Sequence, residues 1–224
     1  MTSSIVGIDK IDSSAKSKLN KNELHQYRQL SNHRKKDFLL GRVALKQALA
    51  NYIAEDLDKA VTIKNAGNGL PYIEGWDNLY CSLGHSYDRG IGVVAHHKVG
   101  VDIEKIRPHK KSLLDYITNQ NEADLVQDFF GTQTDIISLV WVIKESVMKG
   151  VGVGFGIPPK QVEIIGKVED TTFKVKIHKF KSPIWYVWPF KVKDFYISIA
   201  YEKNYRQKPN INWYNSTGIS ASQN

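Results

Sequence analysis

Apolar residues recur at helical spacing in the first quarter of the chain. From about Lys36 to Ile53 they return three and four positions apart, which predicts a helix with one buried face. Ser31 or Asn32 offers a capping side chain for an earlier start. The region therefore predicts one long amphipathic helix near the beginning of the chain.

Short runs of apolar and β-branched residues after this helix predict strands. Two adjacent runs, 91–96 and 99–104, are typical of an antiparallel hairpin that turns near His97 and Lys98. Turn-forming residues between 65 and 71 separate two shorter runs that precede the hairpin. These shorter runs are residues 61–64 and 80–83.

The second half of the sequence repeats this plan. A helix is predicted from about Asp135 to Lys149, with Gly150 in a position suited to end it. Four strand candidates follow, at 162–165, 172–177, 184–187 and 195–201. We therefore expect an α+β protein of two similar halves, with the ligand site in the cleft between them.

The expected division is an N-terminal half, 1–106, and a C-terminal half, 107–201. The remaining residues, 202–224, have the composition of a poorly ordered tail, from which Trp213 and Tyr214 have the character to dock on the body. The glycine-rich run 150–156 is interpreted as a turn that leaves the helix. A nucleotide-binding glycine loop precedes a helix, and this run follows one.

Charge and composition narrow the class of protein. The 224 residues contain 31 Lys and Arg against 23 Asp and Glu, so the net charge is 31 − 23 = +8, which favours an acidic ligand. The basic residues form no long arm and no zinc-finger spacing, so nucleic acid is a disfavoured partner. A single cysteine, Cys81, excludes an internal disulfide framework. Without a signal-like start or a long apolar stretch, we expect a cytoplasmic protein with no membrane partner.

The strand Gly100-Val101-Asp102-Ile103-Glu104 carries the first candidate chemistry. Side chains alternate along a strand, so Asp102 and Glu104 share one face. Two carboxylates of this kind suit Mg²⁺, which takes oxygen ligands together with phosphate and water. The alternative from these residues alone is an exposed strand end with two solvated acids.

The second group of candidate functional residues, Lys144, Glu145 and Lys149, lies on the predicted helix. Glu145 and Lys149 are four residues apart and therefore lie on one side of the helix. An ordinary surface ion pair explains this spacing. The functional alternative makes Glu145 a third metal ligand and assigns the lysines to phosphate oxygens. His85, in the segment Cys81–Ser86, either binds phosphate or ends a strand.

The order of these segments resembles the 4′-phosphopantetheinyl transferase family, in its larger two-halved, surfactin-synthetase-activator-like type. GVDIE precedes WVIKESVMK by about 40 residues, as in the family's signature pair. FLLGR at 38–42, GLP at 69–71 and SLGHS at 82–86 are similar to its upstream segments. The resemblance implies two α/β halves related by pseudo-twofold symmetry, with the active site between them.

The resemblance also implies a reaction and a set of site residues. Such enzymes transfer the 4′-phosphopantetheine arm of coenzyme A to a serine of an apo acyl or peptidyl carrier protein and release adenosine 3′,5′-bisphosphate. By this likeness Asp102, Glu104 and Glu145 hold Mg²⁺, and Lys149 acts in catalysis. The other implied roles are coenzyme A contacts for Arg42, His85, Lys144 and Lys149, and a general base at Glu122.

Two departures from the family pattern weaken the expected coenzyme A contacts. Gly84 stands where a serine or threonine is usual, and Leu70 stands where a lysine or arginine is usual. A charge-assisted contact contributes about 1.5–3 kcal/mol, so coenzyme A affinity is expected to be lower. The alternative function is a non-catalytic protein whose basic cleft binds carrier proteins or nucleic acid. For the enzyme we expect a monomer with an acidic carrier protein as partner.

Overall fold

Two units divide the chain, and each has its own sheet and its own long helix. The computed structural model describes residues 3–9, 11, 13–55, 61–119, 121–127, 129–131, 135–153, 156–169, 171–179, 181, 183–203 and 208–215. The first unit comprises residues 1–98 together with 209–224, and the second comprises residues 99–208. The α+β class expected from the sequence is confirmed in both units.

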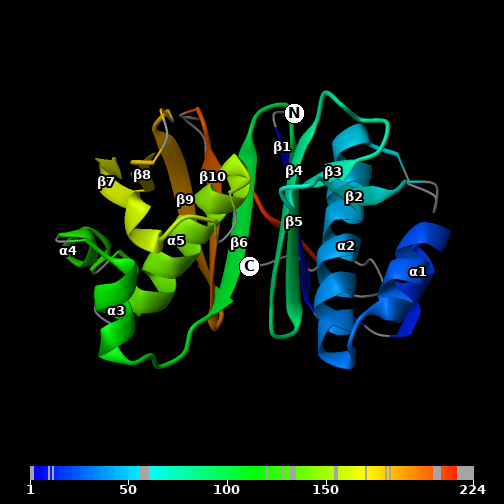
Figure 1. Ribbon diagram of the computed structural model, residues 1–224, viewed down its shortest axis with the longest axis horizontal. Coiled ribbons are helices and arrows are strands. Elements are labelled where there is room, and N and C mark those ends of the chain that lie inside the picture. Colours follow the sequence, from blue (N-terminus) through cyan, green and yellow to red (C-terminus); the bar gives the residue numbers. More distant parts are fainter. Residues whose placement is uncertain are drawn as a thin grey trace. The chain divides into compact units, whose positions relative to one another are not determined.

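The first unit packs helix α2 against a four-stranded sheet (Figure 1). Strands lie in the order β11-β1-β5-β4, and β2 pairs with β3 in a separate hairpin. Five apolar side chains of α2 are fully buried: Leu40, Ala44, Leu45, Ala48 and Leu49. The bounds are β1 Ser3–Asp9, η1 Ser13–Lys18, α1 Lys21–Gln29, α2 Asn32–Ile53, β2 Ile63–Asn65, β3 Pro71–Ile73, β4 Tyr80–Ser86, β5 Arg89–Ala95 and β11 Asn212–Asn215.

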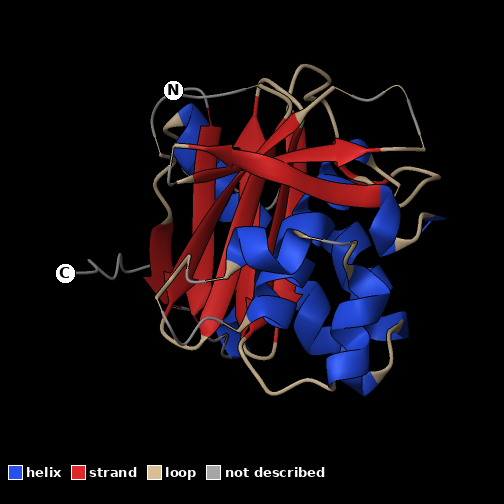
Figure 2. Cartoon of the chain, turned by 90° about the vertical axis from the view of Figure 1, so that its left-hand side faces the viewer, coloured by secondary structure: helices blue, strands red, loops and turns tan. Residues whose placement is uncertain are grey.

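The second unit packs helix α5 against a five-stranded sheet. Figure 2 shows strands in red and helices in blue. The strand order is β6-β10-β9-β8-β7, with every neighbouring pair antiparallel. The bounds are β6 Val99–Lys105, α3 Lys111–Ile117, α4 Glu122–Val126, α5 Ile136–Val151, η3 Pro159–Gln161, β7 Val162–Val168, β8 Thr172–Ile177, β9 Trp185–Val192 and β10 Phe195–Tyr201.

The two units share one order of elements and one pattern of strand pairing. Each begins with a strand, continues through short helical segments into a long helix, and then adds a hairpin and two more strands. In each, the first strand pairs with the fourth strand after the long helix, β1 with β5 and β6 with β10, although β2 and β3 form a separate sheet and β11 is a second partner of β1. The repeated plan expected from the sequence is therefore present in the described residues of both units.

The predicted hairpin of 91–96 with 99–104 is wrong. Strand β5 pairs with β1 and β4, whereas β6 pairs with β10, so these neighbours in sequence belong to different sheets. Alternation of side chains reports that a segment is extended, but it does not report which strand becomes its partner. The observed division of the chain also falls at Lys98, which differs from the expected boundary after residue 106.

The C-terminal segment contains an ordered strand. Residues 212–215, expected within the poorly ordered tail, form β11, which pairs in parallel with β1. Trp213 is only 5% exposed, and Arg89 lies over its ring with 5.4 Å from Cζ to the centroid. The docking of Trp213 and Tyr214 is thus observed, since Tyr214 packs at the edge of the first unit's core and accepts a hydrogen bond from Asn51. Residues 204–207 and 216–224 of the expected tail lie outside the described residues.

Helix α5 continues beyond the glycine expected to end it. Its C-cap is Gly152, whose φ of 81° lies in the left-handed region that favours glycine. Gly150 lies inside the helix. A glycine is needed at this position because a Cβ there would be 2.6 Å from the Trp185 ring. Gly154 and Phe155 of the glycine-rich run lie outside the described residues. Among the helices that the structure describes, none is long and apolar enough to cross a membrane.

Candidate active site

Helix α5 crosses strand β6 at very short range, and a glycine makes this crossing possible. A Cβ atom on Gly100 would lie 1.8 Å from the backbone oxygen of Ser146 and 2.5 Å from the backbone nitrogen of Gly150. Any side chain at position 100 therefore collides with the helix backbone. The glycine of the GVDIE segment places the acids of β6 beside the last two turns of α5.

Lys149 is the cation at this crossing. Its Nζ lies 2.5 Å from Asp102 Oδ1 and 3.9 Å from Glu145 Oε2. Burial on its own lowers the pKa of Lys149, but attraction to Asp102 and then to Glu145 outweighs burial, so the pKa is raised. The side chain keeps 29% of its surface exposed. Lys149 is thus a partly exposed ammonium whose charged form is favoured by its acidic neighbours.

Asp102 is the most buried of the three predicted acids. Burial raises the pKa of its carboxyl well above the usual value, Glu145 and Glu104 raise it further, and Lys149 opposes them. One oxygen, Oδ1, accepts a hydrogen bond from Lys149, while the buried Oδ2 has no hydrogen-bond partner. A buried carboxylate oxygen with no donor carries a large desolvation cost, which a bound cation would relieve.

The charges around Asp102 do not balance within the second unit. With all three acids counted as ionised, they and the two cations Lys149 and Arg107 give −3 + 2 = −1, and Arg107 lies 3.8 Å from Glu104 at the exposed edge. The oxygen donors suit a hard divalent cation such as Mg²⁺. Within the described ranges, however, no three acids or histidines lie close enough together to hold a metal as they stand. Lys149 occupies the position next to Asp102 and Glu145.

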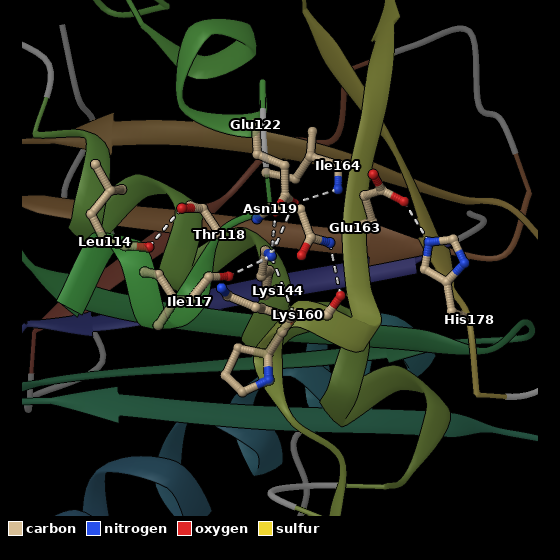
Figure 3. A network of polar contacts seen from close by, with 11 residues as sticks. Leu114, Ile117, Thr118, Asn119, Glu122, Lys144, Lys160, Glu163, Ile164 and His178 are labelled. Atoms are coloured by element: carbon tan, nitrogen blue, oxygen red, sulfur yellow. Dashed lines mark hydrogen bonds and ion pairs between the residues drawn. The ribbon is translucent and has the colours of Figure 1, made fainter. Parts of the chain in front are cut away.

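Lys144 and Glu122 are not at this site, and the roles expected for them are wrong. Lys144 is completely buried, and its ammonium donates to the Ile117 and Pro159 carbonyls at 2.6 and 3.2 Å. Its third partner is Glu122, at 2.9 Å (Figure 3). All three N–H donors of Lys144 are used inside the unit, so it has none left for a coenzyme A phosphate.

Glu122 is equally enclosed. Its two oxygens accept hydrogen bonds from the backbone nitrogens of Asn119, at 2.5 Å, and Ile164, at 2.7 Å (Figure 3). With 1% of its surface exposed it cannot reach the hydroxyl of a protein substrate. A general base must come within hydrogen-bond reach of the proton that it removes, and Glu122 does not. The resemblance gave Glu122 and Lys144 separate roles and gave no sign that the two side chains form a buried pair.

Arg42 is a buried cation with unused donors in the first unit. It is 5% exposed and stacks on Phe38, with 5.0 Å between Cζ and the ring centroid. Its Nη2 donates to Asn65 at 3.2 Å, but the buried Nε and Nη1 have no hydrogen-bond partner. Burial lowers the pKa of Arg42, and Glu23 partly opposes this change. Unsatisfied guanidinium donors favour an anionic ligand.

His85 lies on β4, and α2 packs against this strand. It is partly exposed, and its Nδ1 lies 3.6 Å from the Asp37 carboxylate. Asp37 precedes Phe38, on which Arg42 stacks, so the structure brings His85 to the N-terminal half of α2, which also carries Arg42. These two predicted contacts for coenzyme A therefore share one part of the first unit.

Sequence reasoning missed three residues that surround Arg42 and His85. Phe38 supports the guanidinium of Arg42, Asn65 holds one of its nitrogens, and Asp37 pairs with His85. The four-residue spacing of Phe38 and Arg42 places them on one face of a helix, and this signal was readable. Asn65 comes from a different hairpin, and nothing in the sequence connects it to Arg42.

Comparison with known proteins identifies the second unit. Residues 98–200 match the family described as the 4′-phosphopantetheinyl transferase superfamily. This part of the chain carries Asp102, Glu104, Glu145 and Lys149, and its match to the superfamily supports the resemblance inferred from the two motifs.

Two curated relatives are also similar to about half of the chain. The chain is 30% identical over 122 residues to the 4′-phosphopantetheinyl transferase ffp of Bacillus subtilis, covering 54% of each protein. It is 27% identical over 122 residues to the 4′-phosphopantetheinyl transferase psf-1 of Bacillus pumilus, covering 53% of this chain and 52% of that protein. The matched part thus spans about half the length of these relatives.

A solved structure is also similar to part of the chain. It is a holo-(acyl-carrier-protein) synthase from Bacillus anthracis in complex with coenzyme A (3′,5′-ADP). The identity is 22%, and the match covers 42% of this chain and 92% of that one, with a TM-score of 0.37. The assignment to the superfamily rests on the sequence matches, and this structure adds no weight to it.

Proposed function

We propose that this protein transfers the 4′-phosphopantetheine arm of coenzyme A to a serine hydroxyl of an apo carrier protein. In this reaction the serine oxygen bonds to the phosphorus that carries the pantetheine arm. The P–O bond to the bridging pyrophosphate oxygen breaks, the serine proton passes to an acceptor, and adenosine 3′,5′-bisphosphate leaves. The superfamily match over 98–200 and the names of the relatives support this proposal.

The observation that carries the proposal is the state of Asp102. A buried carboxylate with one oxygen on Lys149 and the other without a donor is costly for stability, because each unpaired buried charge must be offset. Such an arrangement is expected where a ligand completes the site. The surplus of acidic over basic side chains in the cluster favours a ligand of positive charge.

Asp102, Glu104 and Glu145 are the residues that would hold Mg²⁺. When bound, the ion would polarise the phosphate oxygens and offset their charge in the transition state. We further propose that Lys149 then contacts the pyrophosphate, since its ammonium is charged and partly exposed. Without ligand, the hydrogen bond to Asp102 holds the ammonium of Lys149 at the cluster, from which it would move to a phosphate oxygen.

Arg42 and His85 are the proposed contacts for the phosphates at the nucleotide end of coenzyme A. The two unpartnered donors of Arg42 are fixed by the stack on Phe38 and by Asn65, so an anion would meet a preorganised guanidinium. Gly84 and Leu70 provide no charged donor, which makes Arg42 the main source of affinity at this end.

The proposed protein substrate is an acidic carrier domain. The net charge of +8 favours encounter with an acidic surface, chiefly through the association rate and with strong salt dependence. Raising the ionic strength should therefore slow transfer at low carrier concentration. The biosynthetic pathway of the carrier, a cytoplasmic location and a monomeric state stay predictions.

The test is mass spectrometry of apo carriers from several pathways after incubation with this protein, coenzyme A and Mg²⁺. A mass increase of one phosphopantetheine on at least one carrier, abolished by EDTA, is the expected result. Glu145→Gln should reduce transfer at least 100-fold, because a neutral amide is a poor ligand for Mg²⁺. Glu163→Gln, which changes a carboxylate of β7 outside the cluster, is the matched control. Unchanged masses for every carrier would refute the proposed function.

A further inference from the structure

A second buried ion pair lies in the first unit, on helices α1 and α2. Lys46 Nζ lies 2.6 Å from Glu23 Oε2, with side-chain exposures of 10% and 1%. The counterpart in the second unit is Lys144 with Glu122, at 2.9 Å and with exposures of 0% and 1%. In each unit the lysine comes from the long helix and the glutamate from the short helix before it.

The backbone partners of the two glutamates match. The amide nitrogen of an asparagine three residues earlier donates to each: Asn20 at 3.1 Å and Asn119 at 2.5 Å. The amide nitrogen of an isoleucine in the next hairpin donates to each as well: Ile63 at 3.2 Å, 40 residues away, and Ile164 at 2.7 Å, 42 residues away.

The backbone partners of the two lysines match too. Lys46 donates to the carbonyl of Lys18 at 3.0 Å, and Lys144 donates to the carbonyl of Ile117 at 2.6 Å. The two separations are 28 and 27 residues. Each carbonyl lies five residues before the glutamate of its unit, since 23 − 18 = 122 − 117 = 5. Four interactions therefore recur with nearly the same spacing along the chain.

We propose that these are two copies of one device, and that Glu23, Lys46, Glu122 and Lys144 are positioning residues for the long helices. A buried ion pair is a poor source of stability, because apolar residues of similar volume often serve equally well. Its repetition with the same connections therefore indicates a geometric task. Each pair ties its long helix to the preceding short segments and to the following hairpin, which fixes the rotation of the helix about its axis.

The residues presented by each helix show what this rotation controls. One and five positions after the lysine, α5 carries Glu145 and Lys149, whereas α2 carries Gln47 and Asn51, joined by a hydrogen bond of 3.2 Å. Four positions before the lysine the order reverses: α2 carries Arg42 and α5 carries Val140. The same device thus positions the carboxylate–lysine cluster in one unit and the anion-binding arginine in the other.

The tight crossing at Gly100 makes α5 sensitive to this device. Lys144 anchors the helix to α3, α4 and the segment before β7, while Lys149 anchors it to β6. Successive residues of a helix are about 100° apart, so the two anchors act on different sides. With the first anchor lost, the side of α5 that carries Glu145 and Lys149 is held by the contact at Gly100 and by the Asp102 pair.

The test compares two paired apolar replacements, Glu23→Leu/Lys46→Met and Glu122→Leu/Lys144→Met. Replacing both partners leaves no unpaired buried charge, so both variants are expected to fold. This arm rests on the proposed function and uses two ligands: coenzyme A without metal by calorimetry, and Mn²⁺ with saturating coenzyme A by electron paramagnetic resonance. Each variant is the control for the other, because both lose the same type of pair.

The expected result is two separate defects. Glu23→Leu/Lys46→Met should bind coenzyme A at least tenfold more weakly and Mn²⁺ within twofold of wild type. Glu122→Leu/Lys144→Met should bind Mn²⁺ at least tenfold more weakly and coenzyme A within twofold of wild type. Equal losses of both ligands in both variants, or wild-type binding in either folded variant, would overturn the proposal. If a paired variant does not fold, Glu23→Gln and Glu122→Gln take its place with the same criteria.

A measurement without ligands separates this inference from the proposed function. Positioning predicts that Lys149→Met lowers the melting temperature less than half as much in the Glu122→Leu/Lys144→Met background as in wild type, because the pair with Asp102 is then already misaligned. An equal loss in both backgrounds would refute positioning. If wild type binds neither coenzyme A nor Mn²⁺, the proposed function fails and this comparison alone decides the inference.

Discussion

Lys149→Met is the substitution that most directly measures the electrostatics of the β6–α5 cluster. Methionine keeps most of the length and apolar surface of lysine but removes the ammonium 2.5 Å from Asp102 Oδ1. The carboxylate of Asp102, only 2% exposed, then has neither oxygen paired among the described residues. The variant thus converts a half-satisfied buried acid into an unsatisfied one.

The structure sets the size of the effect. Breaking a fully buried pair costs about 3–5 kcal/mol, whereas exposed pairs are worth about 0–1 kcal/mol. Lys149 keeps 29% of its side chain exposed while Asp102 is buried, so the expected loss lies between these cases, at about 2–3 kcal/mol. For a chain of this length that corresponds to a melting temperature lower by about 5–10 °C.

The assay is urea and thermal unfolding of wild type, Lys149→Met, Asp102→Asn and the double variant at pH 7. Because the two residues are in contact, the double variant should lose about 1–2 kcal/mol less than the sum of the single variants. Lys176→Met, at an exposed lysine of β8, is the matched control and should change stability by less than about 0.5 kcal/mol. An additive cycle, or a loss at Lys149 no larger than at Lys176, would refute the reasoning.

Two further experiments test the packing, one in each unit. Gly100→Ala should lower the free energy of unfolding in urea by at least about 2 kcal/mol and impair transfer, because its Cβ would lie 1.8 Å from the Ser146 oxygen. In the control Gly166→Ala, the new Cβ meets nothing within 4 Å, so stability should not change. In the first unit, burial raises the pKa of Cys81 to about 12, so a thiol reagent at pH 8 should label the native protein negligibly and react with one thiol in denaturant. Rapid native labelling of Cys81, or a silent Gly100→Ala, would contradict the packing described.

Much of the fold follows from local patterns that the sequence displays. The long helix α2 was predicted because apolar residues of its second half recur three and four positions apart. Strands β8 and β10 were predicted with their observed bounds because both are short runs rich in apolar and β-branched residues. The strand pairings were harder. Strands β5 and β6 are adjacent in sequence yet belong to different sheets, and no local pattern records that choice.

Some elements gave too weak a signal to be predicted. Strand β1 and helices α1, α3 and α4 are short, and tertiary contacts hold them more than propensity does. Strand β11 was hidden in a polar tail, where Trp213 packs against Gly7, with ring atoms 2.6 Å from where a Cβ would be. Such long-range contacts depend on the whole fold.

The candidate site was predicted only in part from the sequence. Asp102, Glu145 and Lys149 were predicted from their spacing and the family resemblance, and the structure brings Lys149 within 2.5 Å of Asp102 and 3.9 Å of Glu145. Lys144, next in sequence to Glu145, was assigned the same surroundings but points into the interior. Residues one position apart on a helix face different directions, and the pattern alone did not decide which lysine of α5 was buried.

The convergence of Asp102, Glu104 and Glu145 on one divalent ion is the central claim, and crystals grown with coenzyme A and Mn²⁺ test it most directly. The account predicts a single anomalous peak in the second unit, bonded to oxygens of Asp102 and Glu145 and within reach of Glu104, with the Lys149 ammonium moved from Asp102 to a phosphate oxygen. A peak bound elsewhere, or coenzyme A bound while Lys149 stays on Asp102 and no ion is present, would contradict it.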